Sequence, residues 1–506
     1  MALQRWRTSW ELVAVAAVFT VALWFFACAA QQVPFGGDES DYIWTGRYFL
    51  LLFVQRDLTA PDWGDNYWTH TQPMLTRYIV GGWLWARGSD LGTLPPPYDI
   101  FKSREENEQA GRVTDPALLA EARTPAVLLA AGAVALLYGL GRTLIGPLAG
   151  GAAAILALGS PTTPWPIVRA TPEAPLAFFL LLALLLGVLG ARRPDDGGLP
   201  AGWAVATGVA LGLALEAKLT AAFSLAAAAG WGGLVAAAAL RGGHGTVAGR
   251  LSRAWRAGRG WALAIAVSVV IFVVANPHLY PNPPRHAAHL VEQRVREMDD
   301  QRSWFPGSAV PSPAAGLRYV LVGSLIDGAA GGAGLPDGTR AGAHGLVLIA
   351  GLAAAGAVGM LAQSWHALQR TARPPAAGLV LLTALTYGVG IGLSTHMYWT
   401  RYLVPTILLG ALVAAAGLAS TVDWLVTLGA AVRDVAHRAQ RPKQRRPYPR
   451  WTSPGGFPAV LSQRVEAGQM RSDTFRRTYR RNAWRADRRS GDFSSHQLSA
   501  QRPRRD

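Results

Sequence analysis

The sequence predicts an all-α integral membrane protein with about ten transmembrane helices. The 506 residues are 51% hydrophobic and only 16% charged, whereas a soluble domain usually carries about 25% charged residues. Apolar runs long enough to cross a bilayer of about 30 Å recur along the chain. Arginine clusters fall between alternate runs, which is the pattern expected where basic residues mark the cytoplasmic side.

The apolar runs define the elements in chain order. Glu216 and Lys218 interrupt one apolar stretch that is too long for a single bilayer-spanning helix, so we divide it there. The first run follows Arg5 and Arg7, as in a signal peptide, but it is longer than the usual apolar core of one, so we expect a retained helix. The predicted helices lie at about 10–30, 117–140, 143–160, 172–190, 201–217, 219–240, 260–276, 343–362, 376–394 and 402–420.

The basic residues predict the orientation and the partners. With the N-terminus inside, the loop 241–260 ("RGGHGTVAGRLSRAWRAGRG") and the tail are cytoplasmic, while the loops 31–116 and 277–342 lie outside. The net charge is +17, and a basic chain raises nucleic acid as a partner. Because the arginines follow the predicted topology, we expect contacts with membrane lipids and no nucleic-acid partner.

The outside loops and the tail have distinct compositions. "TRYIVGGWLWARG" is apolar and aromatic but too short to cross, which predicts an interfacial helix. "PRHAAHLVEQRVREMDDQ" predicts an amphipathic helix ending before "WFPG", followed by a Gly- and Pro-rich loop. The tail is rich in Arg and poor in aliphatic residues, so we expect disorder. These features divide the chain into a transmembrane domain, 1–430, and a cytoplasmic tail, 431–506.

Unusual polar residues gather at the predicted outer ends of the spans. Random scatter would divide them between both faces, so their clustering predicts a polar cavity that opens outward. Carboxylates can act as a general base, and Arg and Lys suit a phosphate. We expect Asp38 and Glu39 to be catalytic. The expected substrate-binding residues are His70, Arg169, Glu173, Lys218, His278 and Arg401.

A carboxylate base beside a cationic clamp suits displacement of a phosphate leaving group from a lipid carrier. The base would deprotonate an acceptor hydroxyl that attacks the anomeric carbon, while the clamp stabilises charge on the leaving phosphate. No HExxH or Cys/His spacing indicates a dedicated zinc site. Paired carboxylates are also metal ligands, so a divalent metal ion stays open as a cofactor.

Four sequence elements carry a resemblance to a known family. They are "GGDESDYIWTGRYF" after the first helix, "THTQPMLTRYIVG" before an interfacial helix, "AKLTAAF" and "RYLVPTILLGALVAAAG". In these elements the chain resembles the GT-C type, polyprenyl-phosphate-sugar-dependent glycosyltransferases, closest to the protein O-mannosyltransferase and aminoarabinose transferase group. The resemblance implies a GT-C-like fold with interfacial helices in the first outside loop. It also implies an inverting hexosyl- or pentosyltransferase of a bacterial plasma membrane.

The resemblance implies roles for individual residues. Asp38 takes the family's catalytic acid position, with Glu39 beside it, and Lys218 and Arg401 face the carrier phosphate. His70 lies in the His-containing element, although Thr71 and Gln72 stand where a proline is common. The implied donor is a polyprenyl-phosphate-linked sugar, mannose by resemblance, and the acceptor is a protein, a lipid or a glycan on the outer face.

Alternative interpretations exist for the chain and for its residues. A multi-span transporter or lipid flippase would place ionisable residues near mid-membrane on broken helices, whereas these spans carry Ala, Leu, Val and Gly at their centres. Asp38 and Glu39 could form a solvated helix exit, and Lys218 could be a snorkelling end charge. The charges at one face favour the transferase.

Overall fold

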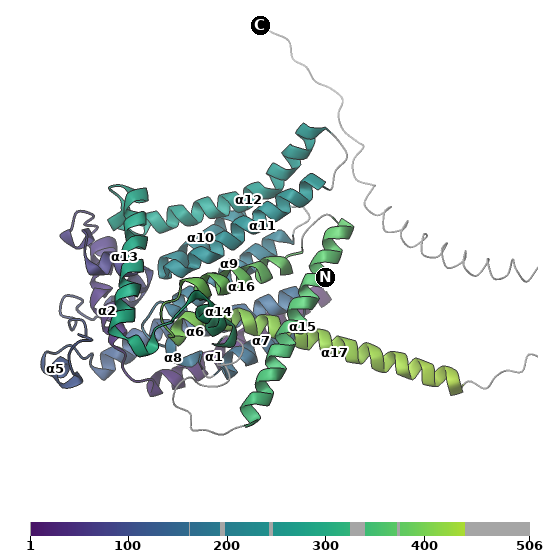
Figure 1. The fold of residues 1–506 in the computed structure, drawn as a ribbon, viewed down its shortest axis with the longest axis horizontal. Coiled ribbons are helices and arrows are strands. Elements are labelled where there is room, and N and C mark those ends of the chain that lie inside the picture. Colours follow the sequence, from purple (N-terminus) through teal and green to yellow (C-terminus); the bar gives the residue numbers. More distant parts are fainter. Residues whose placement is uncertain are drawn as a thin grey trace, which may run out of the picture. The chain divides into compact units, whose positions relative to one another are not determined.

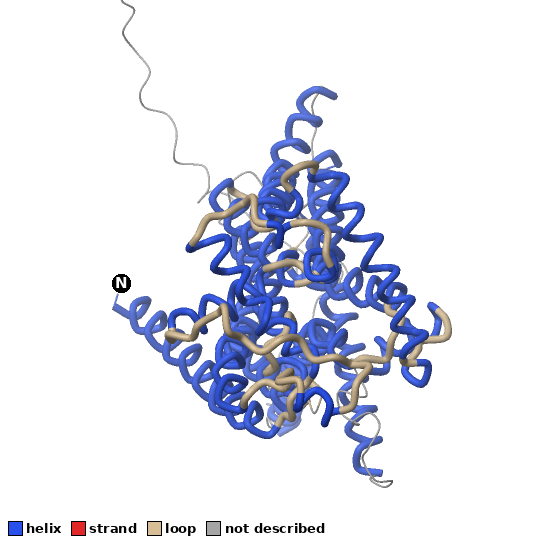
Figure 2. Tube along the Cα trace, turned by 90° about the vertical axis from the view of Figure 1, so that its left-hand side faces the viewer, coloured by secondary structure: helices blue, strands red, loops and turns tan. Residues whose placement is uncertain are grey.

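The computed structural model describes residues 2–160, 162–192, 198–241, 246–323, 340–371 and 375–440. Within these residues the chain is helical and forms no strand, and the one β-type contact is an isolated bridge between Ala309 and Met397. Figure 2 shows helices joined by loops throughout. The predicted all-α class is confirmed.

Helices occur at all ten predicted positions. By length and composition, seven helices in the described part of the chain could cross a membrane, which identifies an integral membrane protein. The helices α7 and α10 are apolar but shorter, so the count of ten spans is not confirmed. The ten helices are α1 (Ala2–Gln32), α6 (Pro116–Leu144), α7 (Pro147–Gly159), α9 (Glu173–Ala191), α10 (Ala201–Ala217), α11 (Ala222–Arg241), α12 (Val247–Val274), α15 (Arg340–Thr371), α16 (Ala377–Ser394) and α17 (Val404–Gln440).

The apolar helices pack into a bundle through small residues. The helix α6 packs against α1, α7 and α9, and a second series of contacts runs from α9 through α10 and α12 to α11 and α16. Figure 1 shows α9 to α12 and α16 side by side. A Cβ atom on Gly208 of α10 would lie 2.5 Å from the Ala264 carbonyl oxygen of α12. Glycine is therefore required for this close backbone approach, as is common between membrane helices.

Shorter helices form the segments between the long ones, and Figure 1 shows α2, α5 and α13 near one end of the bundle. A helix is present at the position of the predicted interfacial helix, as α4, and the predicted amphipathic helix is α13, which extends one residue into "WFPG" and ends at Trp304. The short helices are α2 (Gly37–Trp44), α3 (Tyr67–Thr71), α4 (Leu75–Ala86), α5 (Arg104–Gln109), α8 (Pro164–Ile167), α13 (Pro283–Trp304) and α14 (Pro313–Val322).

Two predicted loops are wrong in part, and side-chain caps give the reason. The predicted loop 241–260 is helical from Val247, because the Thr246 hydroxyl accepts a hydrogen bond from the Gly249 amide and starts α12 early. The predicted loop after α13 contains α14, which Ser312 caps and Pro313 begins.

Only the first residues of the predicted tail, 431–506, belong to the described part of the chain. The helix α17 continues to Gln440, past the predicted start of the tail, and residues 441–506 lie outside the described part of the chain. Contacts divide the chain after Val432, and the site described below belongs to the first unit.

Candidate active site

One cavity of about 830 Å³ brings together segments that are far apart in the sequence. Its walls come from α2, α3, the start of α9, α13 and the segment from Tyr398 to Tyr402. This volume falls within the range of small-molecule sites, about 300–1,000 Å³. The cavity is therefore large enough for a sugar phosphate.

Charged and aromatic side chains line this cavity together. Mixed charges of this kind suit a ligand that carries both a phosphate and hydroxyl groups. The lining cations are Arg77, Arg112, Arg169, Lys218, Arg294 and Arg401, and the lining acids are Asp38, Asp41, Asp99, Glu173 and Glu297.

Asp38 lines the cavity in direct contact with Arg401. Asp38 lies in the first turn of α2, where a carboxylate is favoured by the helix dipole. Its Oδ2 atom pairs with Nη1 of Arg401, which belongs to the short 3₁₀ helix Thr400–Leu403. The Arg401 guanidinium also lies 4.2 Å from the Trp399 ring centroid. The Asp38 side chain is 46% exposed and that of Arg401 is 26% exposed, so a ligand can reach both.

A buried ion pair forms the inner wall of the cavity. Lys218 Nζ lies 2.8 Å from Glu173 Oε1, and 4.7 Å from the Tyr402 ring centroid. The Glu173 Oε2 atom has no hydrogen-bond partner among the described residues. Lys218 is in extended conformation at the end of α10, so the predicted interruption of the apolar stretch is confirmed.

Glu216 holds this interruption in place and does not line the cavity. Its Oε1 accepts a hydrogen bond of 2.8 Å from the Met74 amide, and its Oε2 accepts one from the Asn276 side chain. Met74 precedes α4, and Asn276 follows α12. Glu216 therefore joins three segments behind Lys218.

Glu39 is buried and does not line the cavity, which argues against the catalytic role predicted for it. Its Oε1 accepts from Arg123 Nε at 2.8 Å and from the Ala170 amide at 3.0 Å. Its Oε2 accepts from Arg123 Nη2 at 2.6 Å and from the Gly36 amide at 3.1 Å. Both oxygens are thus occupied by groups of the protein. Glu39 positions α2, and through it Asp38.

Arg169 lines the cavity beside Gly36. A Cβ atom at Gly36 would clash with the Arg169 guanidinium, so glycine leaves room for this side chain. Arg169 Nε is buried and has no hydrogen-bond partner among the described residues. The Arg169 guanidinium therefore has an N–H group free to donate a hydrogen bond next to the start of α2.

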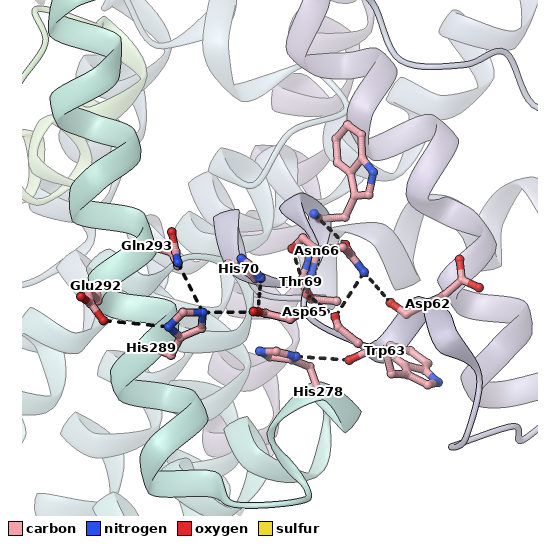
Figure 3. Close-up of polar contacts among 12 residues, drawn as sticks. Asp62, Trp63, Asp65, Asn66, Thr69, His70, His278, His289, Glu292 and Gln293 are labelled. Atoms are coloured by element: carbon pink, nitrogen blue, oxygen red, sulfur yellow. Dashed lines mark hydrogen bonds and ion pairs between the residues drawn. The ribbon is translucent and has the colours of Figure 1, made fainter.

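His70 and His278 lie outside the cavity lining, contrary to the predicted substrate-binding role. The His70 Nε2 atom pairs with Asp65, and the His278 Nδ1 atom lies 3.2 Å from the Trp63 carbonyl oxygen. The two imidazole centroids are 5.8 Å apart, and burial lowers the pKa of both rings. Figure 3 shows them in a separate cluster with Asp65.

The cavity contains residues of α13 that the sequence analysis did not select. Arg294 and Glu297 form an ion pair, and Arg294 Nη2 lies 3.4 Å from the Tyr402 hydroxyl. Gln301 and Trp304 also line the cavity. The spacing of these residues, three, four and three positions apart, places them on one helix face. This spacing is visible in the sequence and indicates that the four residues share one helix face.

Asp41 is a further cavity acid, and its environment predicts a pH effect on stability. Burial raises its pKa to about 7, which nearby Arg77 partly opposes. Between about pH 4 and pH 7 the folded state keeps a proton that the unfolded state releases. The contribution of Asp41 to stability is therefore lost as the pH rises through this window.

We expect Asp41→Asn to remove this pH dependence, because asparagine cannot ionise. The difference in unfolding free energy between the variant and the wild type should change by up to about 4 kcal/mol between pH 4 and pH 8. Chemical unfolding in a non-ionic detergent at several pH values measures it. A difference that stays constant with pH would contradict the raised pKa.

A family model matches one part of the chain. Residues 118–248 match the model described as dolichyl-phosphate-mannose-protein mannosyltransferase. Over these residues, the match confirms the resemblance to polyprenyl-phosphate-sugar-dependent glycosyltransferases. The matched segment runs from α6 into α12 and includes Arg123, Arg169, Glu173 and Lys218.

Solved structures with similar folds were also found. ArnT from Cupriavidus metallidurans bound to undecaprenyl phosphate has a TM-score of 0.46 and 19% identity, over 81% of this chain and 60% of that one. The oligosaccharyltransferase AglB from Archaeoglobus fulgidus, in complex with an inhibitory peptide and a dolichol-phosphate, has a TM-score of 0.47 and 15% identity, over 92% and 54%. The chain thus spans less than two thirds of either structure. No curated protein matched the chain.

Proposed function

We propose that this chain is a membrane glycosyltransferase that moves a sugar from a polyprenyl-phosphate carrier to a hydroxyl group of a protein, lipid or glycan. Mannose is the candidate sugar because of the family match. The observation that carries the proposal is the placement of Asp38 against Arg401 in a cavity that Lys218 and Arg169 also line.

The proposed reaction is a single displacement at the anomeric carbon. Asp38 takes the proton of the acceptor hydroxyl, whose oxygen forms a new bond to the anomeric carbon. The bond from this carbon to the carrier phosphate breaks on the opposite face, so the configuration inverts. Arg401, Lys218 and Arg169 stabilise the charge that develops on the phosphate. The products are the glycosylated acceptor and polyprenyl phosphate.

The Asp38–Arg401 ion pair suggests how donor binding prepares the base. A phosphate bound to Arg401 would compete with the Asp38 carboxylate for the same guanidinium, since Arg binds both groups in the same geometry. Asp38 would then be released toward the acceptor hydroxyl. Binding of the sugar donor would therefore come first, and Asp38 would become available as a base only afterwards.

A transfer assay tests this function against the transporter alternative. Purified protein in lipid vesicles receives a radiolabelled polyprenyl-phosphate sugar and candidate acceptors. We expect label on the acceptor and release of polyprenyl phosphate. Movement of the labelled lipid between leaflets without any transfer would instead support the transporter or flippase. Analysis of lipid-linked sugars in cells lacking the protein would identify the donor as the species that accumulates.

Lys218→Ala and Arg401→Ala are expected to weaken the use of donor more than the use of acceptor. Each variant removes a cation that would face the carrier phosphate, and losing one group that stabilises charge in the transition state typically lowers kcat by about 10²–10³-fold. Steady-state kinetics with donor and acceptor varied separately measure both effects. Arg47→Ala, which removes a cation paired with Asp62 outside the cavity lining, is the matched control. Unchanged donor dependence in both variants would remove these cations from the donor site.

The proposed location of the cavity is the outer face of the membrane. Single cysteines at Ser103 and Ser252, in a background without Cys28, test this orientation, because both serines are exposed. We expect a membrane-impermeant thiol reagent to label position 103 from outside, and position 252 only after the membrane is opened. The reverse labelling pattern would place the cavity on the cytoplasmic side.

A further inference from the structure

The first turns of α12 carry a group of arginines that the proposed reaction does not use. The helix has 28 residues, which is about 42 Å at about 1.5 Å per residue, whereas the hydrocarbon core of a bilayer is about 30 Å thick. Its first part, Val247–Arg259, reads "VAGRLSRAWRAGR", and the continuous apolar part begins only after it. The described residues form no ion pair with Arg250, Arg253, Arg256 or Arg259.

Packing fixes the direction in which this part of α12 faces. Ala254 and Ala257 are buried, and α12 packs along α11. A Cβ atom at Gly260 would clash with the carbonyl oxygen of Leu199, which lies just before α10. Glycine therefore allows the two backbones to touch. Because this contact and the buried alanines leave no room for rotation about the helix axis, the opposite side of the segment has a defined position.

The opposite side of the segment is exposed, aromatic and basic. Leu251, Trp255 and Arg259 follow one another at intervals of four residues, so they form one row along the helix, and Arg256 borders this row. Leu251 is 57% exposed and Trp255 is 68% exposed, and both arginines are exposed as well. We call these four residues the basic face.

The basic face continues into the apolar side of the same helix. Leu263, four residues after Arg259, is exposed, and so are Val270 and Val274 further along. Exposed apolar side chains on a helix of spanning length are those that contact lipid chains. The arginines therefore stand directly beyond the part of α12 that faces the lipid, where the next groups of a bilayer are its headgroups.

We propose that the basic face binds the headgroups of acidic phospholipids in the adjoining leaflet. Trp255 precedes Gly260 by about 8 Å of helix, and the headgroup layer is about 5–8 Å thick on each side of the hydrocarbon core. Trp255, Arg256 and Arg259 thus lie at headgroup depth. Arginine binds phosphate through paired hydrogen bonds, and tryptophan favours the interface between water and lipid.

An acidic soluble protein would match the charge of this face but not its position. Such a partner would have to bind beside the lipid-facing side of α12 and displace the headgroups there. The lipid needs no such displacement. In the orientation proposed above, the leaflet concerned is the cytoplasmic one, which carries acidic lipid. Lipid bound in this way would neutralise Arg256 and Arg259 and hold α12 at a fixed depth in the membrane.

Lipid contacts of the full-length protein test the proposal independently of any transfer activity. A cysteine at Ser252, an exposed position one turn before Arg256, carries a fluorophore in a background without Cys28. Phosphatidylcholine vesicles contain a small fraction of either phosphatidylglycerol or phosphatidylcholine with a quencher on the acyl chain. We expect stronger quenching by phosphatidylglycerol. Arg256→Gln/Arg259→Gln should lower the ratio of the two association constants by about 10–30-fold, since each basic residue near an acidic surface contributes about fivefold.

Arg56→Gln/Arg285→Gln is the matched control, because it removes two exposed arginines from other parts of the chain that form no ion pair with the described residues. Equal quenching by the two lipids in the wild type would overturn the proposal, as would an equal loss in the control variant. Should Arg256→Gln/Arg259→Gln fail to fold, the wild type still decides: its preference should weaken as salt is added, and an unchanged preference would overturn the proposal.

Soluble polyglutamate separates the two kinds of partner. Binding of polyglutamate to the wild type, without any preference for phosphatidylglycerol, would assign the basic face to an acidic protein and overturn the lipid site. We expect the reverse result, in which phosphatidylglycerol is enriched next to position 252 and polyglutamate does not displace it at an equal concentration of negative charge.

Discussion

Asp38→Asn is expected to lower the rate of sugar transfer by about 10²–10⁴-fold, the usual contribution of a general base. The substitution keeps the shape of the side chain and its place in the first turn of α2, but it removes the group that would accept the proton. Because Asp38 is partly exposed in an open cavity, its loss should change the unfolding free energy little. Single-turnover transfer with saturating donor measures the chemical step directly.

Two other aspartates make the result specific. Asp62 also pairs with an arginine, Arg47, at 2.9 Å, but does not line the cavity, so Asp62→Asn should retain transfer. Asp41 lines the cavity one turn after Asp38. If Asp41→Asn abolishes transfer while Asp38→Asn retains it, the base is Asp41 and the assignment to Asp38 is wrong.

The helices were predictable because their cause is local. A run of apolar residues of spanning length has to be helical in a bilayer, where each backbone polar group needs an internal partner. The break at Lys218 was predictable for the same reason, since two charged residues interrupt one apolar run. The early start of α12 was missed because Thr246 caps a segment whose arginines suggested a loop.

The candidate site was predictable only in part, because its contacts are tertiary. Charges at the predicted outer ends of helices indicated a common cavity, and Asp38, Arg169 and Arg401 do line one. Which member of the Asp-Glu pair faces it depends on helix geometry, since successive residues point in directions about 100° apart. The partner of Glu39 is Arg123 on α6, and no local pattern reveals that contact.

The positions of His70 and His278 were not predictable either, because their contacts are also tertiary. His70 and His278 were assigned to the substrate because both flank apolar segments, a local signal. Their actual neighbours are each other and, for His70, Asp65 and His289. A cluster assembled from α3, α13 and the turn after α12 requires the fold to be known first.

Arg123→Ala is expected to destabilise the protein by about 3–5 kcal/mol, the usual cost of leaving one partner of a buried ion pair alone. The Arg123 side chain is 4% exposed and that of Glu39 is fully buried. The guanidinium also donates to the carbonyl oxygens of Ala30, Val33 and Pro34, at 2.8, 2.7 and 3.0 Å. The substitution would therefore strand a carboxylate and three acceptors between α1, α2 and α6.

Glu121 lies on the same helix and supplies the matched control. It pairs with Arg87 at 2.8 Å, but the Arg87 side chain is 62% exposed, and an exposed pair typically contributes at most about 1 kcal/mol. Glu121→Ala should therefore cost far less than Arg123→Ala in unfolding measured in the same detergent. Equal losses in the two variants would contradict the assignment of Glu39 as the residue that fixes α2.

The double variant Glu39→Leu/Arg123→Leu separates the two sources of the expected loss. If the unpaired charge dominates, removing both charges should recover part of the stability, because apolar replacements of buried pairs are often tolerated. Recovery should remain incomplete, since the carbonyl oxygens of Ala30, Val33 and Pro34 still lack donors. The rate of sugar transfer should be lower in the double variant than in the wild type even where the variant folds. The reason is that Asp38 precedes Glu39 on α2, the helix that this ion pair holds against α6.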